Sequence, residues 1–100
     1  MHTLAVNINI PNANSLSVTD DTLTVELDDG RTISVPLAWY PRLKEASATE
    51  KDNWRLIGGG QGLHWMDIDE DISVQGIISG IPSGESQKSF KLWLESRQGY

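Results

Sequence analysis

The chain has 100 residues, of which 38% are hydrophobic and 22% are charged, with a formal net charge of −6. This length suits a single domain, and four tryptophans help to fill one modest core. The absence of cysteine excludes disulfides, thiolate metal sites and cysteine nucleophiles. No signal peptide is recognisable, and no apolar run approaches the roughly 20 residues that a membrane helix needs. We therefore expect a cytoplasmic protein without a membrane-spanning segment.

Acidic residues outnumber basic ones by fourteen to eight, and the two kinds are unevenly distributed. Carboxylates concentrate in residues 20–29 and 67–71, and no basic residue lies between Arg55 and Lys88. A nucleic-acid-binding protein needs clustered cations facing phosphate, so we expect no direct nucleic-acid binding. The acidic stretches either keep the protein soluble or attract a basic protein partner.

The first part of the chain alternates apolar and polar residues, which is typical of half-buried strands. This pattern predicts one strand over residues 4–10 and a short second strand around residues 16–18. The clearest signal is a β-hairpin over about residues 22–37, with a turn at 28–31 in which Gly30 supplies a positive φ. An exposed edge strand at residues 4–10 would also allow a homodimer.

The middle of the chain predicts short helices and a further strand. A helix is expected within residues 37–46, with Pro41 in its first turn. Thr49 is expected to cap one more helical turn. A strand over 54–57 then leads into a glycine-rich bend at 58–62.

The last third predicts a strand followed by a turn within residues 62–71. A helix over 74–78 follows, capped by Ser73 and closed by Gly80. After a short linker, an amphipathic helix is expected over about residues 86–97, with Ser86 as its cap.

This last helix carries Phe90, Trp93 and Leu94 in one stripe, which packs either on the domain or on a partner. Taken together, the elements predict an α+β fold in which a small sheet with a hairpin and further short strands packs on short helices. We expect residues 1–100 to form a single domain.

Aspartates at alternate positions from 67 to 71 resemble the beginning of an EF-hand loop. The sixth and twelfth positions of that loop require glycine and a carboxylate, but they hold Ile72 and Ile78, which excludes the motif. A looser metal site that combines His64 with Asp67 and Asp69 is the alternative to a solvated acidic turn.

No catalytic motif is recognisable in the sequence. The glycines of residues 58–62 lack the Gly-Lys-Ser/Thr ending of a phosphate-binding loop. Only His2 and His64 could act as a base for a serine nucleophile, and no Gly-x-Ser-x-Gly elbow is present. Nothing distinguishes a carboxylate pair, such as Glu70 with Asp71, for acid–base work. We therefore expect no enzymatic activity, no cofactor and no bound metal.

Tryptophan, tyrosine and arginine dominate the energetics of protein interfaces, and these residue types gather in two short stretches of the chain. The alternative is that Trp39 and Trp65 fill a small core. We predict a partner-binding surface formed by Trp39, Tyr40, Arg42, His64 and Trp65. Electrostatic steering is expected from Asp67, Asp69, Glu70 and Asp71.

Three blocks of sequence resemble, in the right order, a bacterial family known as domain of unknown function 2442. The first block joins residues 29–31 (DGR) to 35–43 (VPLAWYPRL). The second is residues 53–58 (NWRLIG), and the third joins 62–65 (GLHW) to 69–74 (DEDISV). The resemblance implies a small α+β fold with a hairpin and adjoining strands on short helices, without an established activity or catalytic residues.

The resemblance covers roughly residues 14–80, and residues 83–100 resemble a helical extension found in some members. Some members resemble the antitoxin half of bacterial toxin–antitoxin pairs, beside a small basic protein, whereas others precede a helix-turn-helix domain. Because this chain stops at Tyr100, the stand-alone antitoxin-like form fits better. We expect a non-catalytic protein-binding module whose partner is small and basic. The alternative is a small-molecule or metal-sensing regulatory domain with its ligand site in residues 64–71.

Overall fold

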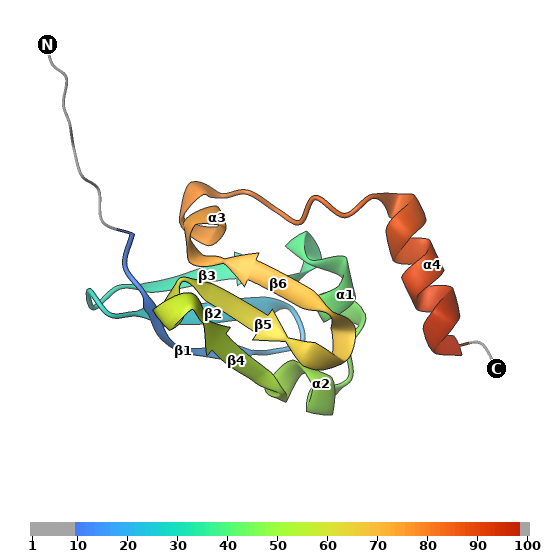
Figure 1. Ribbon diagram of the computed structural model, residues 1–100, viewed down its shortest axis with the longest axis horizontal. Coiled ribbons are helices and arrows are strands. Elements are labelled where there is room, and N and C mark those ends of the chain that lie inside the picture. Colours follow the sequence, from blue (N-terminus) through green and yellow to red (C-terminus); the bar gives the residue numbers. More distant parts are fainter. Residues whose placement is uncertain (1–9, 99–100) are drawn as a thin grey trace, which may run out of the picture.

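The computed structural model describes residues 10–98 (Figure 1). The strand expected over residues 4–10, and the homodimer that it would allow, therefore fall almost entirely outside the described residues. The rest of the chain forms a mixed α+β structure with two small antiparallel sheets, as the sequence predicts.

The first sheet contains the predicted hairpin and one further strand. Its strands, paired in chain order, are β1 (Ala13–Val18), β2 (Thr22–Leu27) and β3 (Thr32–Pro36). Alternation buries Leu23 and Val25 completely on the inner face, while Thr24 and Ser34 share a hydrogen bond on the outer face. Gly30 has a φ of 94° in the turn between β2 and β3, as expected.

Three short helical segments lead from the first sheet to the second. They are the 3₁₀ turn η1 (Leu37–Trp39), α1 (Pro41–Glu45) and α2 (Ala48–Asp52). The prediction that Thr49 caps α2 is wrong, because Ser47 is the cap. Its Oγ accepts from the backbone N of Glu50 at 3.1 Å, and the Glu50 carboxylate accepts from the backbone N of Ser47 at 2.8 Å. Glu50 lies three residues after Ser47, the spacing of a capping box.

The second sheet pairs three strands in chain order. Its segments are β4 (Trp54–Ile57), η2 (Gly58–Gly60), β5 (Gly62–Trp65), η3 (Met66–Ile68) and β6 (Glu70–Ser73). The predicted turn after β5 is correct, but it is shorter than expected and β6 was missed. Asp69 takes a left-handed φ of 53° at the end of η3, and this reversal lets Glu70 pair with Trp65.

The core lies between the two sheets, and Figure 1 shows the second sheet in front of the first. Leu63, Trp65 and Ile72 contribute from the second sheet. Helix α3 (Val74–Ser79) follows β6, with Ser73 as its cap and Gly80 at its end with a φ of 74°, as predicted.

Helix α4 (Gln87–Gln98) lies beside the rest of the domain, at the end of an extended linker (Figure 1). Ser86 caps it as predicted, since its Oγ accepts from the backbone N of Ser89 at 3.0 Å. Phe90 and Trp93 stack with ring centroids 5.8 Å apart, and Trp93 packs against the core. Within residues 10–98, no helix has the length and apolar composition needed to cross a bilayer.

Candidate functional site

The linker between α3 and α4 crosses the segment that joins η1 to α1. The backbone N of Ser83 donates to the Trp39 carbonyl at 3.0 Å, and Arg42 forms an ion pair with Glu85. These contacts hold the linker at a distance from β6 and the start of α3. A hollow remains between them.

This hollow, which we call the Glu70 cavity, has a volume of about 330 Å³. Its walls come from the end of η1, from β6, from α3 and from the linker. They include Tyr40, Glu70, Ser73, Gln75, Gly76 and residues 81–84. Most of these residues are polar, whereas Ile81 and Pro82 give the linker wall an apolar patch.

Tyr40 forms the floor of the cavity. Its backbone links two segments, because its N donates to the Leu37 carbonyl and its own carbonyl accepts from the N of Lys44, both at 2.9 Å. The side chain is only 2% exposed, and its hydroxyl has no hydrogen-bond partner within residues 10–98. Burial, together with the neighbouring Glu70, raises the pKa of Tyr40 to about 12. A buried hydroxyl without a partner is energetically costly, which marks this position as a place for a ligand group.

Glu70 enters the cavity from β6. Strand alternation turns Glu70 and Ile72 toward the interior, while Asp71 and Ser73 remain exposed. Glu70 is only 9% exposed, and no donor among the described residues reaches its carboxylate. Burial, reinforced by the charge of Glu85, raises its pKa to about 7. A carboxyl group with such a shifted pKa, buried beside a cavity, is a candidate functional group.

Arg42 is the positively charged residue that acts on Glu70, but its guanidinium binds other groups. Its Nη2 lies 2.7 Å from Glu85 Oε2, and its Nη1 donates to the Ile68 carbonyl at 3.0 Å. The guanidinium also lies over the Trp93 ring, 5.3 Å from its centroid. Arg42 therefore fastens η3 and α4 to α1, and it lowers the pKa of Glu70 only in part.

The structure corrects three members of the predicted partner-binding surface. Tyr40 and Glu70 are buried at the cavity, and Trp65 has no exposed surface at all. The Trp65 indole Nε1 donates to the Lys51 carbonyl at 3.1 Å, so this ring is a core residue with a satisfied polar group. Sequence alone could not separate buried rings from exposed ones, because the strand that holds Trp65 has only four residues and Tyr40 lies between two short helical segments.

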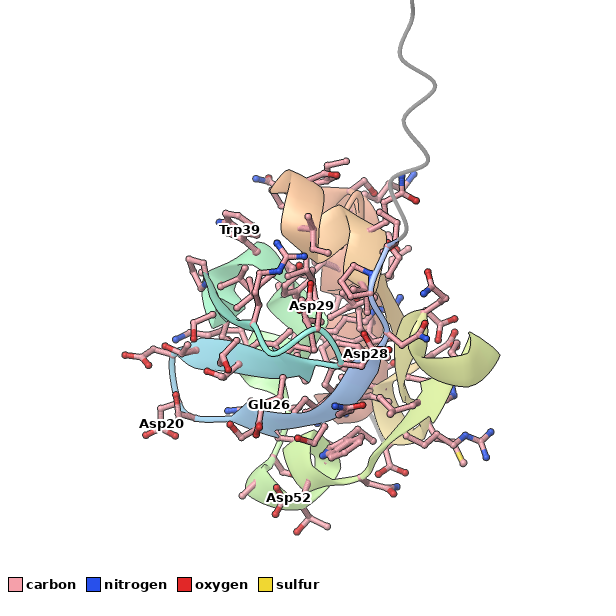
Figure 2. All side chains as sticks on the ribbon, turned by 90° about the vertical axis from the view of Figure 1, so that its left-hand side faces the viewer. Asp20, Glu26, Asp28, Asp29, Trp39 and Asp52 are labelled. Carbon is pink, nitrogen blue, oxygen red and sulfur yellow. The ribbon has the colours of Figure 1, made fainter. Side chains whose placement is uncertain are left out.

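The other residues of the predicted partner-binding surface lie in different parts of the structure. Trp39 is half-buried on η1 (Figure 2), and Arg42 lies in the ion pair with Glu85. His64 pairs with Asp71 across β5 and β6. Asp67 accepts from the Asn53 side chain at 2.9 Å, and Asp69 is exposed beside Arg42 and Glu70. No group of three or more potential metal ligands occurs within residues 10–98, so the looser metal site around His64 finds no support there.

Sequence reasoning missed the contribution of the linker to this site. Glu85 and Ser83 stand in a polar Ser-Gly-Glu-Ser stretch without periodicity, and only the Arg42 contact reveals the role of Glu85. Ser89 Oγ also donates to Glu85 at 2.8 Å, and these contacts hold the pKa of Glu85 below its usual value.

Comparison with protein families matches the family model described as "Protein of unknown function (DUF2442)" over residues 13–83. The chain belongs to the DUF2442 family. The match contains every wall of the Glu70 cavity except Gly84, and it ends before α4. The resemblance expected over roughly residues 14–80 is thereby confirmed.

A crystal structure of a protein of unknown function from Rhodospirillum rubrum ATCC 11170, at 2.75 Å resolution, is similar to this DUF2442 protein. The two chains share 28% identity with a TM-score of 0.68, over 79% of this chain and 98% of that one. Comparison with curated proteins gave no match.

Proposed function

We propose that this DUF2442 protein is a non-catalytic protein-binding module, antitoxin-like in that its partner is a small basic protein. The observation that carries this proposal is that arginines of this chain form ion pairs with its own carboxylates. Arg42 and Arg97 lie in ion pairs with Glu85 and Glu50, each at 2.7 Å, and Arg31 pairs with Asp29 at 2.9 Å. Because these three cations are paired, carboxylates carry most of the unpaired charge on the described surface.

Exposed carboxylates dominate the described surface. Within residues 10–98, eleven carboxylate side chains are exposed against five basic ones. The exposed carboxylates are Asp20, Asp21, Glu26, Asp28, Asp29, Glu45, Asp52, Asp67, Asp69, Asp71 and Glu95. Charge complementarity accelerates encounter and selects against wrong partners, so a basic protein suits this surface better than a nucleic acid does.

One part of this surface is visible in Figure 2. Carboxylates from both turns of the first sheet, from β2 and from the end of α2 are distributed over this side of the molecule. The labelled acidic residues are Asp20, Glu26, Asp28, Asp29 and Asp52, with Trp39 above them. Glu26 stands on a sheet face of serine and threonine side chains, a flat and polar platform. We propose this acidic face as the partner surface, in place of the buried aromatic residues, with steering from Asp67, Asp69 and Asp71.

Because the chain has no cysteine, the proposed complex needs no oxidising compartment, and we propose that it forms in the cytoplasm.

The second candidate function is a small-molecule-sensing domain, and the Glu70 cavity favours it. A pocket lined by two residues whose polar groups have no hydrogen-bond partner in the described part of the chain is the kind of site that small ligands use. This site replaces the stretch of residues 64–71 that the sequence indicated, of which Glu70 lies inside the cavity.

Capture from a lysate of the native host tests the proposed function. The wild-type chain and a variant with Asp20→Asn, Glu26→Gln, Asp28→Asn and Asp52→Asn serve as baits. We expect the wild type to retain one small basic protein at near-equal stoichiometry, and the variant to retain much less of it. Capture of nothing basic by the wild type, also at low salt, would contradict the proposal and favour the sensing function.

A further inference from the structure

Two residues that line the Glu70 cavity carry polar groups without a hydrogen-bond partner among the described residues. The Tyr40 hydroxyl is buried without a partner, and it has two lone pairs and one proton to offer. The Glu70 carboxyl, 9% exposed, borders the same hollow and accepts no hydrogen bond from the described residues. A buried hydroxyl without a partner is rare in protein interiors, and the neighbouring carboxyl is still open to a donor, so a ligand with several donors fits here.

The charges around the cavity specify the sign of that ligand. Glu85, Asp71 and Asp69 all act on Glu70 as like charges. Among the described residues, Arg42 is the one cation that acts on Glu70, and it is held by Glu85 and by the Ile68 carbonyl. A ligand that brings a positive charge and several N–H donors would satisfy Glu70 and offset this local excess of negative charge.

The size and walls of the cavity narrow the class further. A volume of about 330 Å³ accommodates a guanidinium or ammonium group with a short alkyl stem. Ile81 and Pro82 in the linker wall offer apolar surface to such a stem, and basic side chains commonly bury their stems in this way. A guanidinium group is planar and can donate to a carboxylate and to a hydroxyl at the same time.

We propose that the Glu70 cavity binds an alkylguanidinium or alkylammonium group through the Glu70 carboxylate and the Tyr40 hydroxyl. The group comes either from a free amine or from an arginine or lysine of the basic partner. The binding of a cation in the cavity does not depend on the proposed function. Only the second source, an arginine or lysine of the partner, rests on that function.

Titration followed by NMR tests the proposal with n-butylguanidinium and n-butylammonium, and with n-butanol as an uncharged control of similar length. At pH 8 the wild type is expected to bind at least one cation saturably, in the roughly millimolar range, with shifts at Tyr40, Glu70 and Gly76. Glu70→Gln should weaken binding at least tenfold, and Tyr40→Phe severalfold. Glu95→Gln removes one charge from the exposed side of α4, outside the cavity and the acidic face, and should change binding less than twofold. Circular dichroism of each variant establishes that it is folded.

Equal binding of butanol, unchanged binding in Glu70→Gln, or no saturation by either cation up to roughly 100 mM would overturn the proposal. If the lysate yields a basic partner, the same Glu70→Gln variant identifies the source of the cation. If Glu70→Gln binds neither the partner nor the small cation, the cavity binds a side chain of the partner. If Glu70→Gln loses only the binding of the small cation, the cavity binds a free amine. Absence of a partner refutes the proposed function and leaves the result of the titration valid.

Discussion

Arg42 and Glu85 form an ion pair that ties the family domain to the segment beyond it. Arg42 lies inside the DUF2442 match and Glu85 lies outside it, yet Nη2 and Oε2 are 2.7 Å apart. Both side chains are poorly exposed, at 18% and 11%. The pair keeps the linker over the Glu70 cavity, so the position of one cavity wall depends on residues outside the family domain.

Removing the charge of Glu85 should destabilise the protein. Glu85→Gln leaves the Arg42 guanidinium poorly exposed with a weaker acceptor, for which we expect a loss of about 2 kcal/mol in the free energy of unfolding. Urea unfolding measures this loss. Glu95→Gln, on the exposed side of α4, is the matched control and should change stability by less than about 0.5 kcal/mol. Equal effects of the two substitutions would refute the role assigned to the pair.

Burial of Glu70 should make the protein less stable as the pH rises. The native state keeps the Glu70 proton up to a pKa of about 7, whereas the unfolded chain releases it near the usual pKa of 4.5. Between these values the native state binds more protons, so the free energy of unfolding falls with increasing pH, by roughly 3 kcal/mol in total. The charged groups that face Glu70 are Glu85, Arg42, Asp71 and Asp69.

Comparison of the wild type with Glu70→Gln between pH 5 and pH 8 isolates this contribution. The variant cannot ionise at this position, so we expect it to lose the decline and to be the more stable protein at pH 8. Parallel stability curves for the two proteins would show that the buried carboxyl does not titrate in this range.

Glu50 should have the opposite effect at lower pH. Its hydrogen bonds to Arg97, followed by those to Ser47, lower its pKa to about 2. The stabilisation is present above the unfolded pKa of 4.5 and is lost as the pH falls toward 2. Because Glu50 is partly exposed, we expect about 1–2 kcal/mol. Thermal unfolding at pH 6 and pH 3 should show a smaller acid-induced loss for Glu50→Gln than for the wild type. Glu45→Gln serves as the control and should follow the wild type.

Trp65 and Trp39 should respond differently when each is replaced by alanine. Trp65→Ala empties the middle of the core and should cost about 3–5 kcal/mol, a large part of the stability of a domain of this size. Trp39→Ala affects a half-buried ring at the surface and should leave the circular dichroism spectrum nearly unchanged. Urea unfolding measures both losses, and a loss below about 1 kcal/mol for Trp65→Ala would contradict the core assignment.

Local signals predicted most of the fold. The hairpin, the Ser73 and Ser86 caps and the glycine at the end of α3 each depend on neighbours in sequence, and they are found where expected. Strand β6 was missed because its four residues follow a single-turn reversal at Asp69, and only pairing with β5 identifies them as a strand.

The site was harder to predict because distant segments build it. Trp65 and Glu70 face inward only because β5 and β6 pair, and Tyr40 meets Glu70 across 30 residues of sequence. A run such as Asp-Glu-Asp gives no sign that its middle carboxyl is buried. The position of Glu85 depends on the path of the linker, which no local pattern specifies.

The most direct test of the central claim is the mass of the complex that this protein forms with the captured basic protein after both are purified. Size-exclusion chromatography with light scattering at about 50 mM and about 500 mM salt gives this mass. We predict a single complex with one copy of each chain at low salt, weakened at high salt and by neutralisation of the acidic face. Two separately eluting proteins at low salt would contradict the binding function.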